Sequence, residues 1–197
     1  MGAQLEFWFD FASTYSYLSA MRIEQAASAK GVSVSWQPFL LGPIFAEQGW
    51  KNSPFNIYPA KGRYMWRDME RLTAARDLPF QRPAAFPQNS LKAARLALAI
   101  EAPDQRAEFT RAVYAAEFGA GRDISDAEVL AECLADAGLS PDLLTRIGDA
   151  DIKAELFEQV ERAKARGIFG APSFVAGDEL FWGDDRLDDA ISYALTI

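Results

Sequence analysis

The chain has no histidine and a single cysteine, Cys133, among its 197 residues. Without histidine it cannot build the Ser-His or Cys-His pairs that activate nucleophiles, and it lacks the commonest zinc ligand. With one cysteine, no disulfide can form within the chain and no CxxC redox motif exists. We therefore predict no metal site. Any chemistry must come from hydroxyls, carboxylates, amines, backbone groups or a reactive group supplied by another molecule.

Long hydrophobic runs are also missing. No apolar stretch approaches the roughly 18 residues of a membrane span. The first residues, MGAQLEFWFDF, enter a predicted strand without the charged and apolar regions of a signal peptide. We therefore expect a cytoplasmic protein with no membrane partner. The length and the 50% hydrophobic content suit a globular chain of one domain with an insertion, or of two small lobes.

Positive charge is scarce, since 20 Lys and Arg stand against 28 Asp and Glu, a formal net charge of −8. This balance disfavours nucleic acid as a partner. The window from Lys51 to Arg82 differs: seven basic residues minus three acidic ones leave +4 there and −12 elsewhere. Two interpretations are open, a solvated helix face with paired charges or a local field that attracts a small anion.

Hydrophobic periodicity predicts strands at both ends of the chain and helices between them. Strands are expected at Gln4–Phe11 and Val32–Phe39, with a helix at Tyr15–Lys30 between them, which makes a βαβ unit. Residues 42–59 are rich in Pro, Gly and aromatic side chains and are predicted to form a long ordered loop, often a sign of a binding site.

The rest of the chain predicts a block of helices followed by a hairpin and a last helix. Helices are expected at Ala60–Arg76, Ser90–Ile100, Asp104–Phe118, Asp126–Ala137, Pro141–Ile147 and Asp151–Arg166. Two strands, Ser173–Ala176 and Leu180–Trp182, are joined by a Gly177-Asp178 turn, and the last helix runs from Asp184 to Leu195.

This order, βαβ, helices, then ββα, predicts an α/β protein with a thioredoxin-like fold and an inserted all-helical domain. Residues 1–40 and 167–197 would form the thioredoxin-like domain, and residues 41–166 the inserted domain with a substrate-covering loop. In that fold the first strand ends at the reactive site, and a proline turn precedes the third strand. Ser13-Thr14-Tyr15-Ser16 and Ala171-Pro172 stand at these two places.

Five stretches along the whole chain resemble 2-hydroxychromene-2-carboxylate isomerases and the related kappa-class glutathione transferases. They are FDFASTYSYL, KGRYMWRDMERL, FPQNSLKAAR, GIFGAPSFV and ELFWGDDRLD. Thr14 stands where the family usually has proline, which is favoured but not required at a helix start. The resemblance implies a glutathione-dependent isomerase of aromatic-compound breakdown, with glutathione as cofactor and a small aromatic keto acid as substrate. We also expect a homodimer.

Ser13 has two interpretations. Its oxygen can cap the following helix by accepting a hydrogen bond from a backbone N–H of the first turn. The resemblance implies that Ser13 is catalytic and that its hydroxyl donates a hydrogen bond to the sulfur of glutathione. The helix start would then favour thiolate over thiol. Ser16, one turn later, is expected to pack or to contact the residues that bind the ligand, and Cys133 is expected to pack.

The resemblance also implies the remaining site. The Ala171 backbone would pair with the cysteinyl part of glutathione. Pro172 would be cis, although only about 5–6% of X–Pro bonds are cis, so the sequence alone favours trans. The γ-glutamyl end would bind at Trp182, Gly183, Asp184 and Asp185, with backbone N–H groups taking its carboxylate and Asp185 its ammonium; helix capping is the other role open to Asp184. The residues expected to meet the second substrate are Asn52, Lys61, Arg63, Tyr64 and Asn89.

Two alternatives stay open at this stage. One is a transferase that keeps the thioether adduct. The other is a redox-silent thioredoxin-like module that binds partners, which the missing CxxC also fits. The module predicts no affinity for glutathione, whereas either enzyme predicts millimolar binding or better.

Overall fold

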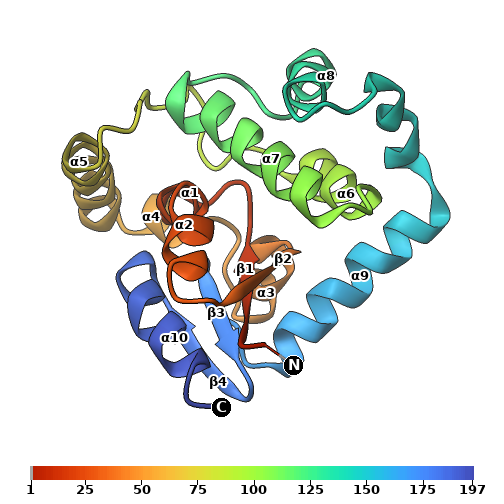
Figure 1. The fold of residues 1–197 in the computed structure, drawn as a ribbon. Helices are drawn as coiled ribbons and strands as arrows, with labels where there is room; N and C mark the ends of the chain where they lie inside the picture. Colours follow the sequence, from red (N-terminus) through yellow and green to blue (C-terminus); the bar gives the residue numbers. More distant parts are fainter. Residues whose placement is uncertain (1) are drawn as a thin grey trace.

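The computed structural model describes residues 2–197 and has a four-stranded mixed sheet with helices against both faces (Figure 1). The strands lie in the order β2-β1-β3-β4. They are β1 (Gln4–Phe9), β2 (Ser33–Pro38), β3 (Ser173–Ala176) and β4 (Glu179–Trp182). β1 runs parallel to β2 and antiparallel to β3, which pairs antiparallel with β4. The predicted βαβ and ββα units are therefore both present.

Helices occupy most of the segments where the sequence predicts them. Among those that the structure describes, one is a π-helical turn and two are 3-10 helices. In chain order they are α1 (Thr14–Ala20), α2 (Ile23–Ser28), α3 (Leu41–Glu47), α4 (Pro54–Ile57), α5 (Pro59–Ala75), α6 (Leu91–Ala99), α7 (Pro103–Tyr114), the π-helical η1 (Ala115–Gly119), α8 (Ala127–Asp136), the 3-10 helix η2 (Pro141–Gly148), α9 (Ala150–Ala165), the 3-10 turn η3 (Asp184–Arg186) and α10 (Leu187–Ala194). Within residues 2–197, none of these helices combines the length and apolarity of a membrane span.

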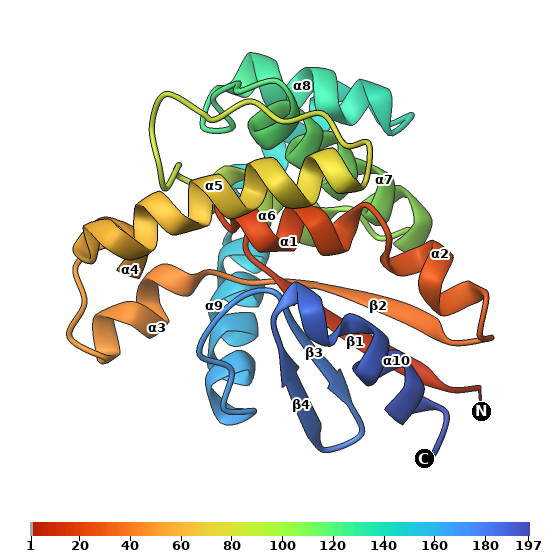
Figure 2. The same ribbon diagram turned by 90° about the vertical axis from the view of Figure 1, so that its left-hand side faces the viewer.

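Alternating side chains of β1 enter two different cores. Leu5, Phe7 and Phe9 are fully buried on one face, in the same cluster as apolar residues of α1, α2, α6, α7, α8 and α10. Trp8 points to the other face and packs with residues of α3 and α9. Figure 2 shows α5, α6 and α7 above the sheet and α9 behind it. Because the sheet and helices α6–α8 share one core, the division of the chain into two domains stays a proposal.

The single helix predicted at Tyr15–Lys30 is wrong, because the chain forms α1 and α2 with a break at Met21 and Arg22. Arg22 leaves helical geometry, with a φ of −130°. Its guanidinium donates to the backbone carbonyl and the carboxylate of Asp184, at 2.7 and 3.4 Å, at the far end of the chain. A contact over 162 residues accompanies this break, and local periodicity does not report it.

The long loop predicted at residues 42–59 is also wrong in part, since most of α3 and all of α4 fall in this range. Pro43 is in the first turn of α3, where a missing N–H costs no helical hydrogen bond. Ser53 caps α4 by accepting from the Phe55 N–H at 3.3 Å, and Pro54 occupies the first helical position. Gly62 lets α5 pass close to α4, because an added Cβ would lie 2.3 Å from the Phe55 carbonyl oxygen.

Candidate active site

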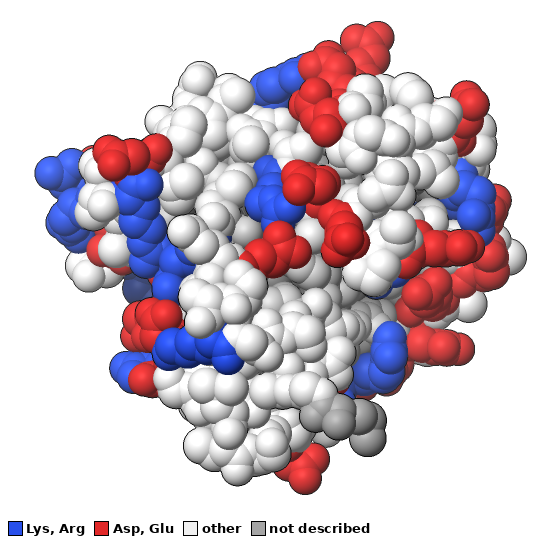
Figure 3. All heavy atoms as spheres, in the orientation of Figure 1, with Lys and Arg blue, Asp and Glu red and all other residues white. Residues whose placement is uncertain are grey.

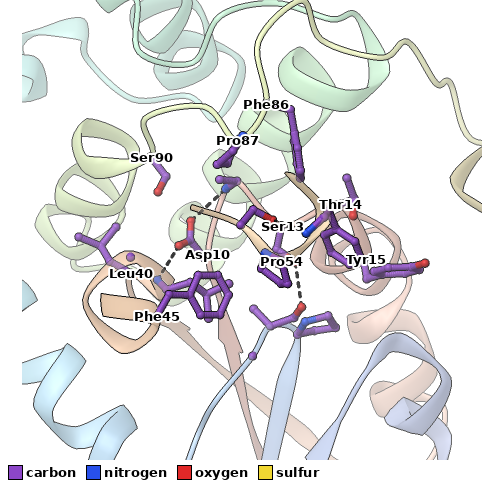
Figure 4. A pocket seen from close by; sticks show the side chains of 18 of the residues that line it. Asp10, Ser13, Thr14, Tyr15, Leu40, Phe45, Pro54, Phe86, Pro87 and Ser90 are labelled. Carbon is purple, nitrogen blue, oxygen red and sulfur yellow. Dashed lines mark hydrogen bonds between the residues drawn. The ribbon is translucent and has the colours of Figure 1, made fainter. Parts of the chain in front are cut away.

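A large cavity opens at the carboxyl end of β1, between the sheet, helices α3 to α5 and the segment around residues 86–91. Its volume is about 1360 Å³. Ligand pockets for one small molecule usually measure roughly 300–1,000 Å³, so this cavity has room for a tripeptide beside a second ligand. Figure 4 shows Ser13, Asp10 and Ser90 directed into it, together with apolar side chains of α3, α4 and the 86–87 segment.

Ser13 is the N-cap residue of α1, and its side chain makes two hydrogen bonds. Its Oγ accepts from the Ser16 N–H at 3.3 Å, which is the expected cap, and donates to the Ala171 carbonyl at 2.9 Å (Figure 4). The side chain is 8% exposed. The two places singled out in the sequence, 158 residues apart, therefore meet in one hydrogen bond. Ser16 is fully buried, in keeping with a packing role.

The proline turn at Ala171-Pro172 faces the same cavity. The peptide bond between these residues is cis, so the expectation of trans from base rates is wrong and the one from the resemblance is confirmed. A second cis bond, Phe86-Pro87, was not predicted. In the described part of the chain the Ala171 N–H has no hydrogen-bond partner. Ala171 thus offers a free backbone N–H, and among the described residues its carbonyl oxygen accepts only the Ser13 hydroxyl. An extended peptide that pairs with this residue needs both groups.

Asp10 is a site residue that the sequence reasoning missed. It directly follows β1, is 4% exposed and lines the cavity. Its carboxylate accepts the Ala12 N–H at 3.0 Å and the Leu41 N–H at 2.7 Å, so it joins the reactive turn to the start of α3. Burial raises the pKa of Asp10, and the hydrogen bonds from Leu41, Ser90 and Ala12 act in the opposite direction. The sequence signal that could have identified Asp10 is a carboxylate placed directly after a buried strand.

The Trp182–Asp185 turn forms another wall of the cavity. Trp182 is half exposed and packs its ring against Phe169 at 5.0 Å between centroids. Gly183 has a φ of 106°, in the region that favours glycine, and an added Cβ would meet the Asp185 carboxylate at 2.5 Å. Asp184 is buried and hydrogen-bonded within the protein, whereas the Asp185 side chain is 75% exposed. Asp185 is paired only with Arg186, at 3.5 Å, within residues 2–197, and its expected role toward an ammonium group stays a prediction.

Three of the five residues expected to meet a second substrate line the cavity, namely Asn52, Lys61 and Asn89. The oxygens of both amides accept backbone N–H groups, Asn52 from Ser53 at 2.7 Å and Asn89 from Leu91 at 3.1 Å. Their NH₂ groups are thus turned away from these backbone donors.

Arg63 and Tyr64 do not line the cavity. Tyr64 is 62% exposed and its ring lies 5.6 Å from the Arg71 guanidinium, on the outer side of α5. Figure 3 shows basic side chains gathered at the edge of the molecule formed by α5. Residues two apart in an α-helix point to different sides, which separates Lys61 from Arg63. The part of the basic window that includes Arg63 is therefore a solvated helix face.

Aromatic side chains form much of the cavity wall around Ser13. Phe45 of α3 packs on Trp50, with ring centroids 5.5 Å apart, and Phe55 of α4 packs on Tyr15 at 6.4 Å. The Tyr15 hydroxyl donates to Asp68 at 3.0 Å. Burial and this carboxylate raise the pKa of Tyr15 well above its ordinary value. Tyr15 therefore carries its proton and donates it to the hydrogen bond with Asp68.

A thioredoxin-like sheet, a serine at the turn after β1 and a cis-proline turn beside the same large cavity define the class to which this chain should be compared. The family model of the DSBA-like thioredoxin domain matches residues 4–195. A 2-hydroxychromene-2-carboxylate isomerase of Sphingobium xenophagum is 32% identical over 99% of this chain and 100% of its own length. Glutathione S-transferase kappa 1 of Homo sapiens is 26% identical over 93% of this chain and 87% of its own.

Solved structures agree with these relatives. A structure of 2-hydroxychromene-2-carboxylate isomerase superimposes with a TM-score of 0.88 at 25% identity, covering 96% of this chain and 93% of its own. The chain belongs to the DSBA-like thioredoxin domain family, in the group that resembles 2-hydroxychromene-2-carboxylate isomerases and kappa-class glutathione transferases. The resemblance noted in the sequence is thereby confirmed. The relatives are isomerases and transferases, which supports an enzyme.

Proposed function

We propose that this protein is a glutathione-dependent isomerase of the 2-hydroxychromene-2-carboxylate type. The observation that carries the proposal is the hydrogen bond between Ser13 and Ala171 at the edge of a cavity large enough for two ligands. The relatives named as such isomerases support it. Cytoplasmic location and a homodimer stay predictions from the sequence.

The residues present fit glutathione. Ala171 supplies a free N–H and a carbonyl for the cysteinyl backbone, and Asp185 supplies an exposed carboxylate for the ammonium. When bound, glutathione would supply a nucleophilic sulfur that adds reversibly to the conjugated keto acid, permits rotation about the former double bond and is regenerated.

Ser13 has one proton to donate, and the Ala171 carbonyl holds it in this structure. A ligand N–H that bonds to the Ala171 carbonyl would compete with the Ser13 hydroxyl for that oxygen and weaken its hold on the hydroxyl. Ser13 would then be free to donate to a thiolate, while its oxygen still caps α1. A charge-assisted hydrogen bond of this kind stabilises the anionic form and lowers the pKa of the bound thiol. The aromatic walls and the apolar α3 and α4 residues would hold the rings of the second substrate and exclude water.

The test is binding followed by product analysis. Reduced glutathione at about ten times a millimolar Kd should stabilise the folded protein by roughly 1.4 kcal/mol and raise Tm. S-methylglutathione should bind less well, because it has no thiolate to accept from Ser13. Equal binding of the two would move the sulfur away from Ser13. No rise in Tm with glutathione would favour the redox-silent module.

A transferase of the kappa type is the second candidate, because human glutathione S-transferase kappa 1 is among the relatives. The two enzymes differ in their product. With an aromatic keto acid, the isomerase returns all glutathione as free thiol, whereas the transferase consumes thiol and accumulates a thioether. Thiol titration beside chromatography of the keto acid distinguishes them.

Lys61 is the cation that we propose for the substrate carboxylate, since it lines the cavity and Arg63 does not. Replacing Lys61 with Met should weaken binding of the aromatic acid by about 1–3 kcal/mol, the range for a charged hydrogen bond, and raise its KM accordingly. Arg63→Met, on the same helix, is the matched control and should leave KM unchanged. Kd for glutathione, measured in both variants, should not move. A change in that Kd with KM constant would instead assign Lys61 to the tripeptide.

A further inference from the structure

Arg76, at the end of α5, lies between two cavities. It lines the main cavity and also a smaller neighbouring cavity of about 430 Å³, formed with residues of α1, α2 and α10. Asp185 lines both cavities as well. In the sequence Arg76 stands out only as one of the seven basic residues of the 51–82 window.

The guanidinium of Arg76 is bound at one end only. Its Nη2 donates to the Asp184 carboxylate at 2.6 Å, and Asp184 is 5% exposed. Its Nη1 is buried and has no hydrogen-bond partner among residues 2–197. A buried donor without a partner costs free energy, so a guanidinium left in this state calls for a partner that enters from elsewhere.

Arg76 shares its one carboxylate, Asp184, with Arg22. Arg22 pairs with two carboxylates, Asp184 at 3.4 Å and Asp188 at 3.1 Å. Asp184 also accepts the Ser19 hydroxyl at 2.9 Å, so its oxygens are shared among three donors. Two guanidinium groups are thus balanced within the cluster by Asp184 and the exposed Asp188, and Arg76 contacts only the shared one.

Asp185 is in the opposite situation. Its one ion pair within residues 2–197 joins it to Arg186 at 3.5 Å, and its side chain is 75% exposed. A cation with a spare donor and an anion with spare acceptors therefore line the same end of the cavity. A ligand group with one negative and one positive charge on a single carbon matches this arrangement.

We propose that Arg76 binds the α-carboxylate of the zwitterionic amino-acid end of glutathione, next to the ammonium that the proposed function already assigns to Asp185. The inference rests on the proposed function and adds a charged side chain from the inserted helices to the backbone groups of the Trp182–Asp185 turn. The planar guanidinium group of arginine suits a carboxylate. Nη2 of Arg76 would stay on Asp184, while Nη1 would donate to the ligand.

Two analogues of glutathione separate the charges. Glutaryl-Cys-Gly lacks the ammonium, and 4-aminobutyryl-Cys-Gly lacks the α-carboxylate. We expect Arg76→Met to weaken glutathione and glutaryl-Cys-Gly by about 10- to 100-fold in calorimetric Kd, and to change 4-aminobutyryl-Cys-Gly less than about twofold. Asp185→Asn should do the reverse, weakening glutathione and 4-aminobutyryl-Cys-Gly but not glutaryl-Cys-Gly.

A purely structural role predicts a different pattern. If Arg76 only holds Asp184 in place, Arg76→Met will weaken all three ligands by the same factor, and that outcome overturns the proposal. Arg71→Met, on the outer side of α5, is the control and should bind all three as wild type does. Arg76→Lys keeps a cation beside Asp184 without the planar fork, so it should show the same selective loss by a smaller factor even if Arg76→Met folds poorly. Failure of wild type to bind glutathione would overturn the proposed function itself.

Discussion

Replacing Ser13 with Ala should lower the rate at neutral pH by roughly 10- to 30-fold, because the bound thiol loses the donor that favours its anion and its pKa rises by about 1.5. The rate should recover as pH rises, since thiolate then forms without help. Stability should fall by about 1–2 kcal/mol, from the lost cap of α1 and the lost bond to the Ala171 carbonyl. The rate and the ultraviolet absorbance of bound thiolate are measured across pH.

Ser140 offers the matched control for the cap. Its Oγ accepts the Asp142 N–H at 3.2 Å at the start of η2, and Ser140 does not line the cavity. Ser140→Ala should lose a comparable capping energy and keep the wild-type pH profile. If Ser13→Ala also keeps that profile, Ser13 is a cap and nothing more, and the mechanism proposed here loses its central residue.

Replacing Glu117 with Gln should make the protein more stable relative to wild type as pH rises. Glu117 lies in the π-helical turn η1, is fully buried, and both of its carboxylate oxygens lack a hydrogen-bond partner within residues 2–197. Burial raises its pKa well above the ordinary value of 4.5, and the negative charges of Asp10 and Asp123 add to the shift. The folded chain thus holds a proton that the unfolded chain releases.

The sign of the pH effect follows from this difference. Below the unfolded pKa both states are protonated and wild type has its full stability. As pH rises toward the folded pKa, wild type loses about 1.4 kcal/mol of stability per pH unit, and Gln cannot titrate. Urea unfolding at several pH values gives the difference between the two proteins. Glu158→Gln, an exposed change on α9, controls for the loss of one negative charge. Parallel stability curves for wild type and Glu117→Gln would show that Glu117 does not hold its proton.

The order of strands and helices and the place of the reactive turn follow from local sequence. Alternating apolar residues in β1 and β2 can bury themselves only as strands, and the hydroxyl-rich turn after β1 can start a helix only where a side chain such as Ser13 caps it. Position in the fold then brings Ser13 beside the proline turn, and the hydrogen bond to Ala171 bears this out. Alanine-rich and capped segments similarly predict α6 and α8.

Other features depend on groups that are distant in sequence and contribute nothing to a local pattern. The start of α3 is tied to the Asp10 carboxylate, 31 residues away, and the break between α1 and α2 accompanies the pairing of Arg22 with Asp184.

By itself the sequence determined a thioredoxin-like chain with no CxxC motif and no histidine, which excludes a redox dithiol and the Ser-His and Cys-His nucleophile pairs. Only the tertiary structure decided which members of the basic window line the cavity, since Lys61 and Arg63, two residues apart on α5, lie on different sides of the helix while packing puts Arg76 against Asp184.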